Sequence, residues 1–196
     1  MDRFERTEGA RARKKRETQR RISDKALELF LTKGYDSTTL DEIAAGAGIA
    51  RRTFFSYFKT KEAILMAYVD GGFAPSFRPI LLAQARGLTP LEAVQRSLLE
   101  LFSARDEAES MAVHRLLEST EGLRTRMLAV PFKMERAVFE VLCEIWPAPE
   151  DRDRLRMVAV VSIGALRVAK EAWRNDEGRS PLSDHLRNCF AMFGNV

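Results

Sequence analysis

Five polar residues within one short segment carry groups that suit nucleic-acid binding. They are Arg51, Arg52, Thr53, Tyr57 and Lys61. A guanidinium can donate two hydrogen bonds to O6 and N7 of guanine, whereas hydroxyl and ammonium groups suit phosphate oxygens. This chemistry requires a rigid element that presents the five side chains together.

Two short helices joined by a glycine turn are predicted to provide that element. Thr39 followed by Glu42 is the pattern of a capping box, so a first helix begins there. Gly48 supplies the residue tolerant of positive φ that a tight turn between helices requires. The second helix can turn Phe54 and Phe58 inward and its polar residues outward. The pattern indicates a helix-turn-helix, which places one helix in a DNA major groove.

An ordinary helical hairpin, in which Arg51 and Arg52 are merely solvated, is the alternative. The distribution of charge favours the DNA-binding interpretation. Residues 1–61 hold 15 Lys and Arg against 9 Asp and Glu, a net charge of +6, and the remainder carries −2, which gives the overall +4. The basic excess therefore lies on the segment with the motif, as expected of a nucleic-acid-binding domain.

A longer helix is predicted before the motif, from about Thr18 or earlier to Lys33, with Gly34 just after its end. A basic run at residues 11–16 precedes it. Two interpretations of this run stay open, namely a flexible arm on DNA phosphates and a solubilising, disordered terminus.

The segment over about residues 18–68 resembles the DNA-binding domain of the TetR family of bacterial transcriptional regulators. The matching residues are Ala26–Phe30, Gly34-Tyr35, Thr38-Thr39, Ile43-Ala44, Gly48-Ile49, Thr53-Phe54-Phe55, Tyr57-Phe58 and Lys61-Glu62. The resemblance implies that the residues meeting DNA are Thr39, Arg51, Arg52, Thr53, Phe55, Ser56, Tyr57 and Lys61.

Three positions depart from the family pattern. Ala50 stands where many members carry serine, so a helix cap is missing. Phe55 replaces a frequent tyrosine, which leaves packing or sugar contact there, and Ser56 replaces a frequent basic or aromatic residue. These departures predict a weaker affinity or a shifted sequence preference.

The rest of the chain is predicted to be helical, because strand-like alternation is absent, and the fold class is all-α with about nine helices. One helix is expected over 61–69, with a break or kink at Gly71-Gly72 and the prolines at 75–79. A long helix is expected over 119–145, disturbed at Pro131.

Three parts of the chain are predicted. They are a flexible basic arm at 1–17, a three-helix helix-turn-helix domain at 18–61, and a helical ligand-binding and dimerisation domain at 62–196. The ligand-binding and dimerisation roles follow from the resemblance. At 196 residues the chain has room for a small module and a domain with a sizeable core.

Large adaptable side chains in the predicted ligand-binding domain can line an apolar cavity or form plain core. The candidate pocket residues are Phe73, Phe77, Phe102, Met111, His114, Arg115, Met127 and Phe132. Segments 114–126 and 166–173 resemble a TetR subgroup associated with acyl-coenzyme A-like ligands. Arg115, Arg124 and Arg126 could meet an acidic head group, or could be solvated and paired with glutamates.

Two C-terminal helices are predicted to carry apolar stripes, at 151–175 and 181–193. Their candidate dimer-interface residues are Leu155, Val158, Ser162, Leu166, Leu186, Cys189, Phe190 and Phe193. These residues would either pair with two symmetry mates in an isologous four-helix bundle or bury against their own subunit. The need for two DNA half-sites favours the dimer.

No catalytic constellation, phosphate-binding glycine loop or metal-ligand spacing is present in the sequence, so neither an enzyme, a cofactor nor a metal site is predicted. The absence of a long apolar run and of a secretory signal predicts a cytoplasmic location. The two cysteines, Cys143 and Cys189, are expected to be buried thiols.

These features predict a sequence-specific DNA-binding transcriptional regulator. The resemblance implies a homodimeric repressor that binds a palindromic operator and is released by a small apolar or amphipathic effector, such as an acyl-CoA-like ligand. Two rival classes are a helical enzyme or lipid carrier, and a peripheral membrane protein that uses residues 11–25. The ordered motif argues against both.

Overall fold

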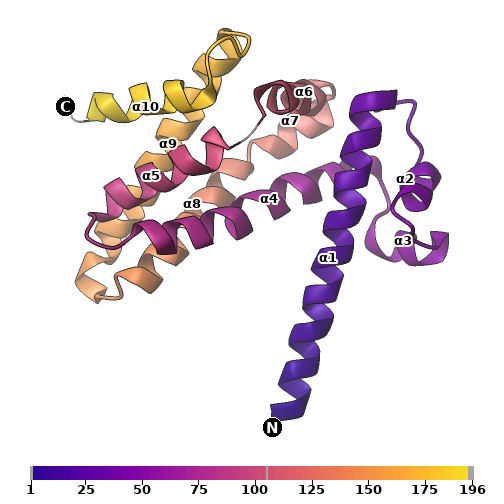
Figure 1. The fold of residues 1–196 in the computed structure, drawn as a ribbon, viewed down its shortest axis with the longest axis horizontal. Helices are drawn as coiled ribbons and strands as arrows, with labels where there is room; N and C mark the ends of the chain where they lie inside the picture. The colour runs from indigo at the N-terminus through magenta and orange to yellow at the C-terminus, as the bar shows by residue number, and fades with distance from the viewer. Residues whose placement is uncertain (1, 105, 194–196) are drawn as a thin grey trace. The chain divides into compact units, whose positions relative to one another are not determined.

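The computed structural model describes the backbone of residues 2–104 and 106–193, and the side chains of 13–104 and 106–192. Within those ranges it contains α-helices and one 3-10 turn and no strand, which confirms the all-α class (Figure 1). The helices are α1 (Asp2–Lys33), α2 (Leu40–Gly46), α3 (Arg51–Tyr57), α4 (Lys61–Gln84), α5 (Pro90–Ser103), α6 (Glu107–Glu118), α7 (Glu121–Met127), α8 (Val130–Ile145), α9 (Arg152–Asn175) and α10 (Leu182–Phe193). The 3-10 turn is Pro149–Asp151.

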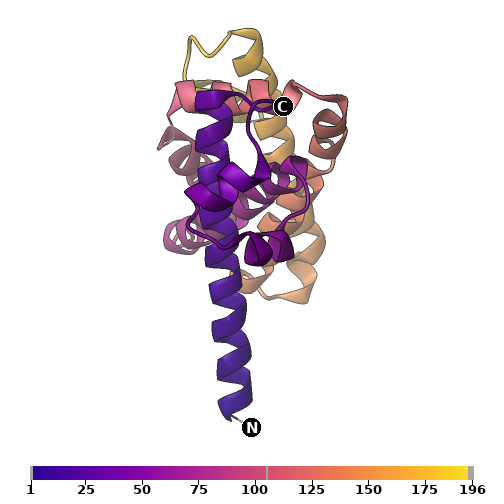
Figure 2. The same ribbon diagram turned by 90° about the vertical axis from the view of Figure 1, so that its right-hand side faces the viewer.

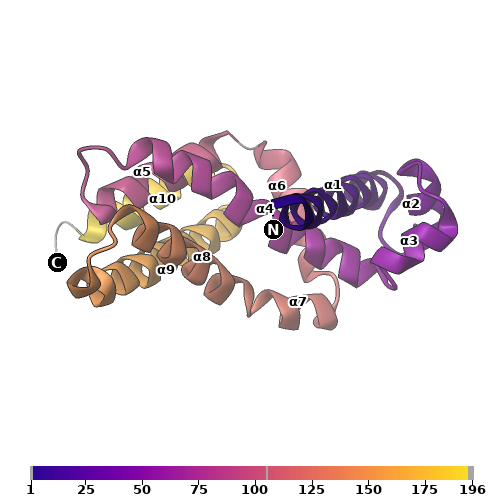
Figure 3. The same cartoon turned by 90° about the horizontal axis from the view of Figure 1, so that it is seen from below.

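The chain divides into two compact units, Met1–Gly71 and Gly72–Val196. The division falls inside α4, whereas the sequence predicts a domain boundary at the start of this helix. In the first unit α1, α2 and α3 are consecutive helices in contact. In the second unit α9 packs against α5, α8 and α10, as Figure 3 shows.

Helix α1 begins at Asp2, so residues 2–17 continue the helix where the sequence predicts a flexible arm. Figures 1 and 2 show its N-terminal half extending beyond α2 and α3. Good helix formers fill this stretch, and the side chains of Arg13 and Glu17 pair across one turn at 3.6 Å. The basic side chains of residues 13–16 are exposed along the helix.

Helix α4 is continuous through the stretch where the glycines and prolines predict a break or kink, so the predicted break is wrong. Phe73, Phe77 and Leu81 recur every fourth residue and are buried, whereas Pro75 and Pro79 are exposed. Burial of a large apolar side chain contributes about 1.5–3 kcal/mol, and a proline inside a helix costs about 3 kcal/mol. Three buried side chains therefore offset two prolines on the opposite side.

The helix predicted over 119–145 is two helices, α7 and α8, and the described residues contain ten α-helices, close to the predicted number of about nine. Leu128 and Ala129 separate them, and Pro131 lies in the first turn of α8. Proline is tolerated there because the first N–H groups of a helix have no partner within it. Pro131 therefore starts a helix instead of disturbing one.

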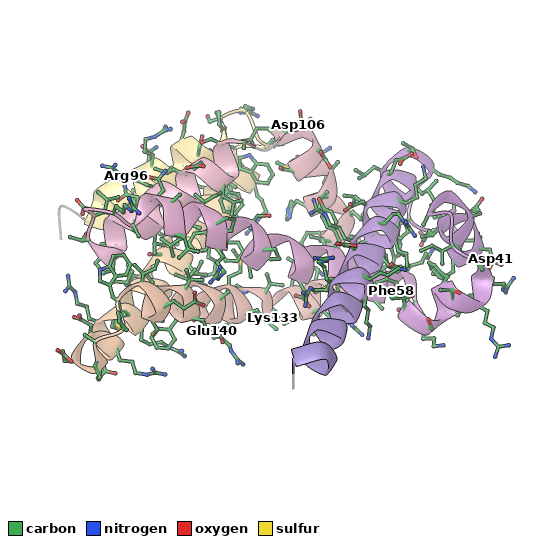
Figure 4. The ribbon with its side chains drawn as sticks, turned by 60° about the horizontal axis from the view of Figure 1, so that its bottom comes forward. Asp41, Phe58, Arg96, Asp106, Lys133 and Glu140 are labelled. Atoms are coloured by element: carbon green, nitrogen blue, oxygen red, sulfur yellow. The ribbon has the colours of Figure 1, made fainter. Side chains whose placement is uncertain are left out.

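The second unit has one apolar core, to which α4, α5, α8, α9 and α10 all contribute. Met134, Val138 and Leu142 supply the inner side of α8. Ala159, Ala165 and Ala169 supply small residues on the inner side of α9. In Figure 4 the labelled Lys133 and Glu140 lie along α8, outside this buried stripe.

Candidate DNA-binding site

The capping box predicted from Thr39 and Glu42 is confirmed at the start of α2. The Thr39 hydroxyl accepts from the Glu42 backbone N–H at 3.2 Å, and a Glu42 carboxylate oxygen accepts from the Thr39 N–H at 2.9 Å. Lys33 also donates to Glu42. Together the Lys33 ammonium and the Thr39 donors lower the pKa of Glu42 to about 2. Two interactions therefore fix where α2 begins, one local and one from the end of α1.

The turn between α2 and α3 has the predicted glycine at its centre. Gly48 has φ +64°, in the left-handed region that a side chain disfavours. Its N–H donates to the Ala45 carbonyl, and the Ile49 N–H donates to Ala44. These bonds use carbonyls that the short α2 leaves open, and they fix where α3 starts.

Buried aromatic residues hold the inner side of α3. Phe54 is fully buried and Phe58 nearly so, as the sequence predicts. Figure 4 shows Phe58 between α3 and α1. Ile22 of α1, Ile43 of α2 and Ile64 of α4 are fully buried in the same unit. Apolar burial on one side therefore orients the polar side of α3 outward.

The first turn of α3 presents its donors to solvent. Arg51, Arg52 and Thr53 are exposed, and Ala50 provides no side-chain cap, as its residue type predicts. Ser56 is exposed, but its hydroxyl donates to the Thr53 carbonyl at 2.6 Å. Ser56 thus keeps acceptor capacity toward a ligand, while its proton is used within the helix.

Aromatic residues flank this exposed row. Phe55 and Tyr57 are half-buried, one on each side of Ser56. The Phe55 ring packs edge-on against Phe54, with centroids 5.4 Å apart. The structure thereby brings the predicted residues of α3 onto one short helix.

Arg51 has a partner that the sequence does not predict. Its Nη1 lies 2.8 Å from Oδ2 of Asp41, in the first turn of α2, and its Cζ lies 5.5 Å from the centre of the Phe55 ring. The two residues of the ion pair lie on different helices, so their contact depends on the path of the turn. Helical spacing could not have revealed it.

Lys61 also has partners that the sequence does not predict. Its Nζ donates to the backbone carbonyls of Tyr35 at 2.5 Å and Asp36 at 3.3 Å, and lies 4.6 Å from the centre of the Tyr35 ring. Lys61 therefore ties the start of α4 to the loop between α1 and α2. Burial, together with the nearby Glu62, raises the pKa of the Tyr35 hydroxyl.

Several predicted pocket residues contribute to the core of the second unit. Phe73, Phe77 and Phe102 are buried, and the rings of Phe73 and Phe77 stack with centroids 5.0 Å apart. Met111 is partly buried against the same core. His114 is half-buried with its ring edge-on to Trp173, and burial lowers the pKa of the imidazole.

The remaining pocket candidates lie closer to solvent. Met127 is half-buried, Arg115 is exposed, and Phe132 is 70% exposed. Phe132 lies on the side of α8 opposite Met134 and Val138, so it does not join the core that contains Phe73 and Phe77. Residue type does not give the phase of α8, which turns this residue outward.

One arginine proposed for an acidic head group already has local partners. Arg124 pairs with Glu121 at 2.5 Å and donates to the Glu118 carbonyl at 3.0 Å. For Arg124 the structure supports the alternative interpretation, a helix arginine paired with neighbouring glutamates. Arg115 and Arg126 are exposed.

Most of the predicted dimer-interface residues are buried within their own unit, so the alternative interpretation holds for them. The buried ones are Leu155, Ser162, Leu166, Leu186, Cys189 and Phe190. Val158 is half-buried, and the side chain of Phe193 lies outside the described residues. The apolar side chains that α9 exposes are instead Met157 at 60%, Val160 at 38% and Val168 at 51%.

The described part of the chain contains no helix long and apolar enough to cross a membrane. Within the same residues, no group of three or more His, Cys, Asp or Glu is arranged to hold a metal ion. Cys189 is buried as expected and Cys143 is half-buried, and both thiols are free.

Comparison with known proteins places this geometry in a family. Residues 22–68 match the model for bacterial regulatory proteins of the tetR family. The regulator TcmR of Streptomyces glaucescens is 30% identical over 174 residues, which cover 84% of this chain and 76% of TcmR. The putative mycofactocin biosynthesis regulator MftR of Mycobacterium tuberculosis is 29% identical over 192 residues, 93% of this chain and 92% of MftR.

Solved structures show the same fold. The TetR-family repressor FadR of Thermus thermophilus, crystallised with lauroyl-CoA, superimposes with a TM-score of 0.58 at 23% identity, over 89% of this chain and 92% of FadR. FadR of Bacillus subtilis, crystallised with stearoyl-CoA, gives 0.56 at 20% identity, over 88% and 95%. The chain therefore belongs to the TetR family of bacterial regulatory proteins, and it is a DNA-binding transcriptional regulator rather than an enzyme.

Proposed function

We propose that this protein is a homodimeric repressor that binds a palindromic operator and is released by a small amphipathic effector. The observation that carries the proposal is the exposed row of Arg51, Arg52 and Thr53 on a helix anchored by Phe54. Donors on a rigidly held helix can meet base edges and phosphates at once. Helix α3 of each protomer would enter a major groove.

The proposed contacts divide by chemistry. Arg51 and Arg52 meet base edges. The residues that meet phosphates or sugars are Thr39, Thr53, Phe55, Ser56, Tyr57 and Lys61. Lys61 has two roles in this proposal, since its ammonium also joins the loop before α2 to α4.

A dimer follows from the need to place two copies of α3 on one operator. We assign the contact to the exposed side of α9, where Met157, Val160 and Val168 form an apolar stripe. Gly164 lies within the stripe and has open space where a side chain would project. Charges of both signs flank the stripe, because Asp153, Arg156, Arg167 and Glu171 are exposed beside it. An isologous contact can pair such charges across its two-fold axis.

The effector is proposed to be an acyl-CoA-like molecule that binds in the second unit. Phe73, Phe77, Phe102 and Met111 supply adaptable apolar side chains there, and His114 supplies a polar group. The two FadR neighbours hold lauroyl-CoA and stearoyl-CoA, which supports this ligand class. Release requires only that the ligand bind more tightly to a conformer that fits DNA poorly.

Two measurements on the purified protein test the proposal. Light scattering gives the oligomeric state, and fluorescence anisotropy gives affinity for a symmetric site recovered from the native genome, intact or with one half scrambled. We expect a dimer whose affinity falls at least tenfold on the scrambled site. A monomer with equal affinity for both duplexes would refute the dimeric arrangement.

The same anisotropy assay tests the effector. Lauroyl-CoA should lower operator affinity, while free coenzyme A and lauric acid, which each lack half of the amphipathic molecule, should act weakly. A folded dimer whose operator affinity does not respond to lauroyl-CoA would contradict the acyl-CoA assignment and leave the DNA-binding part standing.

A further inference from the structure

Arg51 is the first residue of α3, and it is held on two sides before any DNA is bound. Its Nη1 pairs with Oδ2 of Asp41 at 2.8 Å, and its guanidinium carbon lies 5.5 Å from the centre of the Phe55 ring. The Arg51 and Asp41 side chains are 72% and 53% exposed. Figure 4 shows Asp41 on the side of the first unit away from α1. The pair therefore lies on the outer surface formed by α2 and α3.

The pair is not needed to hold the two helices together. Exposed ion pairs contribute little to folding, because water screens both charges. Phe54 of α3 and Ile43 of α2 are both fully buried in this unit, and the two helices are in contact. Removing the Asp41 carboxylate should therefore leave the fold intact and change mainly how freely Arg51 moves.

Arg52 provides a natural contrast. It is also exposed, and across the ranges that the structure describes it forms no ion pair. The two arginines carry the same charge and adjoin each other, but only one of them is oriented. An arginine loses much side-chain conformational entropy when it is fixed. An arginine that is already oriented has lost part of that entropy before DNA binds.

The geometry of a guanidinium makes this orientation useful. Arginine has five N–H donors in a planar fork, and the bond to Asp41 uses one of them. The remaining donors can still approach O6 and N7 of a guanine as a pair. A carboxylate at the edge of the groove also disfavours close approach of phosphates, so Asp41 opposes non-specific binding.

We infer that Asp41 is a positioning residue that makes Arg51 the main specificity-determining arginine, while Arg52 contributes affinity and a smaller share of the base preference. This inference rests on the proposed function, because it assumes that α3 contacts an operator. It assigns unequal roles to two arginines that sequence reasoning treats alike. It also assigns a role in DNA recognition to an acidic residue.

The test is selection from a random duplex library at fixed moderate salt, followed by sequencing. Wild type is compared with Asp41→Asn, Arg51→Ala, the double variant and Arg52→Ala. Asp36→Asn is the matched control, because it removes one exposed carboxylate from the loop before α2 without touching Arg51. Circular dichroism and thermal unfolding establish that each variant is folded.

We expect Asp41→Asn to reduce the preference for one base pair per half-site by about tenfold, which is the scale of one bidentate contact. Arg51→Ala should lose preference at the same base pair, and adding Asp41→Asn to Arg51→Ala should change no base preference further. Asp36→Asn should raise affinity for all duplexes slightly and leave every preference intact. Arg52→Ala should lower affinity and weaken the base preferences less than Arg51→Ala does.

Two results would overturn the inference while the proposed function stands. In one, Asp41→Asn binds all duplexes more tightly with an unchanged motif, which would make Asp41 a simple competitor for Arg51. In the other, it alters a base pair that Arg51→Ala does not affect. A folded wild type that selects no symmetric motif would instead refute the proposed function, and the inference with it.

Discussion

The two units of this protein hold their candidate functional residues by different kinds of contact. In the first unit the polar residues of α2 and α3 have single, specific contacts, such as the capping box of Thr39 and the Arg51–Asp41 pair. In the second unit the functionally interesting side chains are apolar and belong to a large shared core. Polar contacts need particular residue types at particular spacings, whereas apolar residues can serve core, cavity or interface alike.

The largest expected effect contrasts two phenylalanines of the second unit. Phe77→Ala should lower the free energy of unfolding by about 3–5 kcal/mol, because Phe77 is fully buried in the core. Phe132→Ala should change it by less than about 0.5 kcal/mol, because Phe132 is 70% exposed. Denaturant titration followed by circular dichroism measures both. Equal losses would contradict the position given to Phe132.

Val168→Glu tests the surface proposed for dimerisation. A charge placed on the exposed stripe of α9 should weaken the dimer at least tenfold and leave each protomer folded, because Val168 is 51% exposed. Sedimentation at several concentrations gives the dissociation constant. Leu128→Glu, on a side chain that is 73% exposed between α7 and α8, is the matched control. Dissociation by both variants or by neither would argue against α9 as the interface.

Comparing Lys61→Ala with Lys59→Ala separates a structural role of a lysine from an electrostatic one. Lys61→Ala should destabilise the first unit by about 1 kcal/mol, since two carbonyls lose a charged donor. Lys59 is exposed, so Lys59→Ala should leave stability unchanged. If both lysines meet phosphates, each variant should reduce the slope of log affinity against log salt by about one. A Lys61→Ala variant that unfolds at the wild-type temperature would contradict the structural role of Lys61.

The smallest expected effect is the difference between two capping boxes of the same composition, Thr39 with Glu42 and Thr89 with Glu92. Thr→Ala in either should cost about 0.5–2 kcal/mol. Both glutamates have a lowered pKa, from donors at their threonines and, for Glu42, first from Lys33. A pKa that is lower in the folded protein than in the unfolded chain stabilises the fold at any pH above the ordinary pKa of glutamate. That contribution is lost as the pH falls through the folded-state pKa.

For Glu42 the loss should run from pH 4.5 down to about 2. Glu42→Gln should remove this part of the acid dependence, and thermal unfolding measured between about pH 5 and about pH 2 reports it. Glu92→Gln is the comparison, since Glu92 has no lysine among the groups that lower its pKa. An identical acid dependence for the two variants would mean that Lys33 contributes nothing at Glu42.

Local patterns predicted the first unit well because its signals are short-range. Thr39, Gly48 and the buried Phe54 and Phe58 all lie where the sequence indicates. The contact between Arg51 and Asp41 escaped prediction because it depends on how the turn brings two helices together. The sequence signals concern one helix at a time, and this pair belongs to two.

In the second unit, helix phase determines which side chains are buried, and residue type alone does not predict it. Leu155 and Leu166 were predicted at a dimer interface because they share an apolar stripe, but their own subunit buries them. The exposed Met157 and Val168 belong to the neighbouring stripe of the same helix. Only the packing of α9 against α8 and α10 determines which stripe faces inward.

Selection of native genomic fragments on the purified protein shows whether α3 reads a symmetric operator. Wild type and the Arg51→Ala, Arg52→Ala double variant are used at the same moderate salt. Wild type should retain fragments sharing one two-fold-symmetric motif, and the double variant should lose this enrichment while remaining folded. Retention by both proteins without a common motif would contradict operator reading by α3.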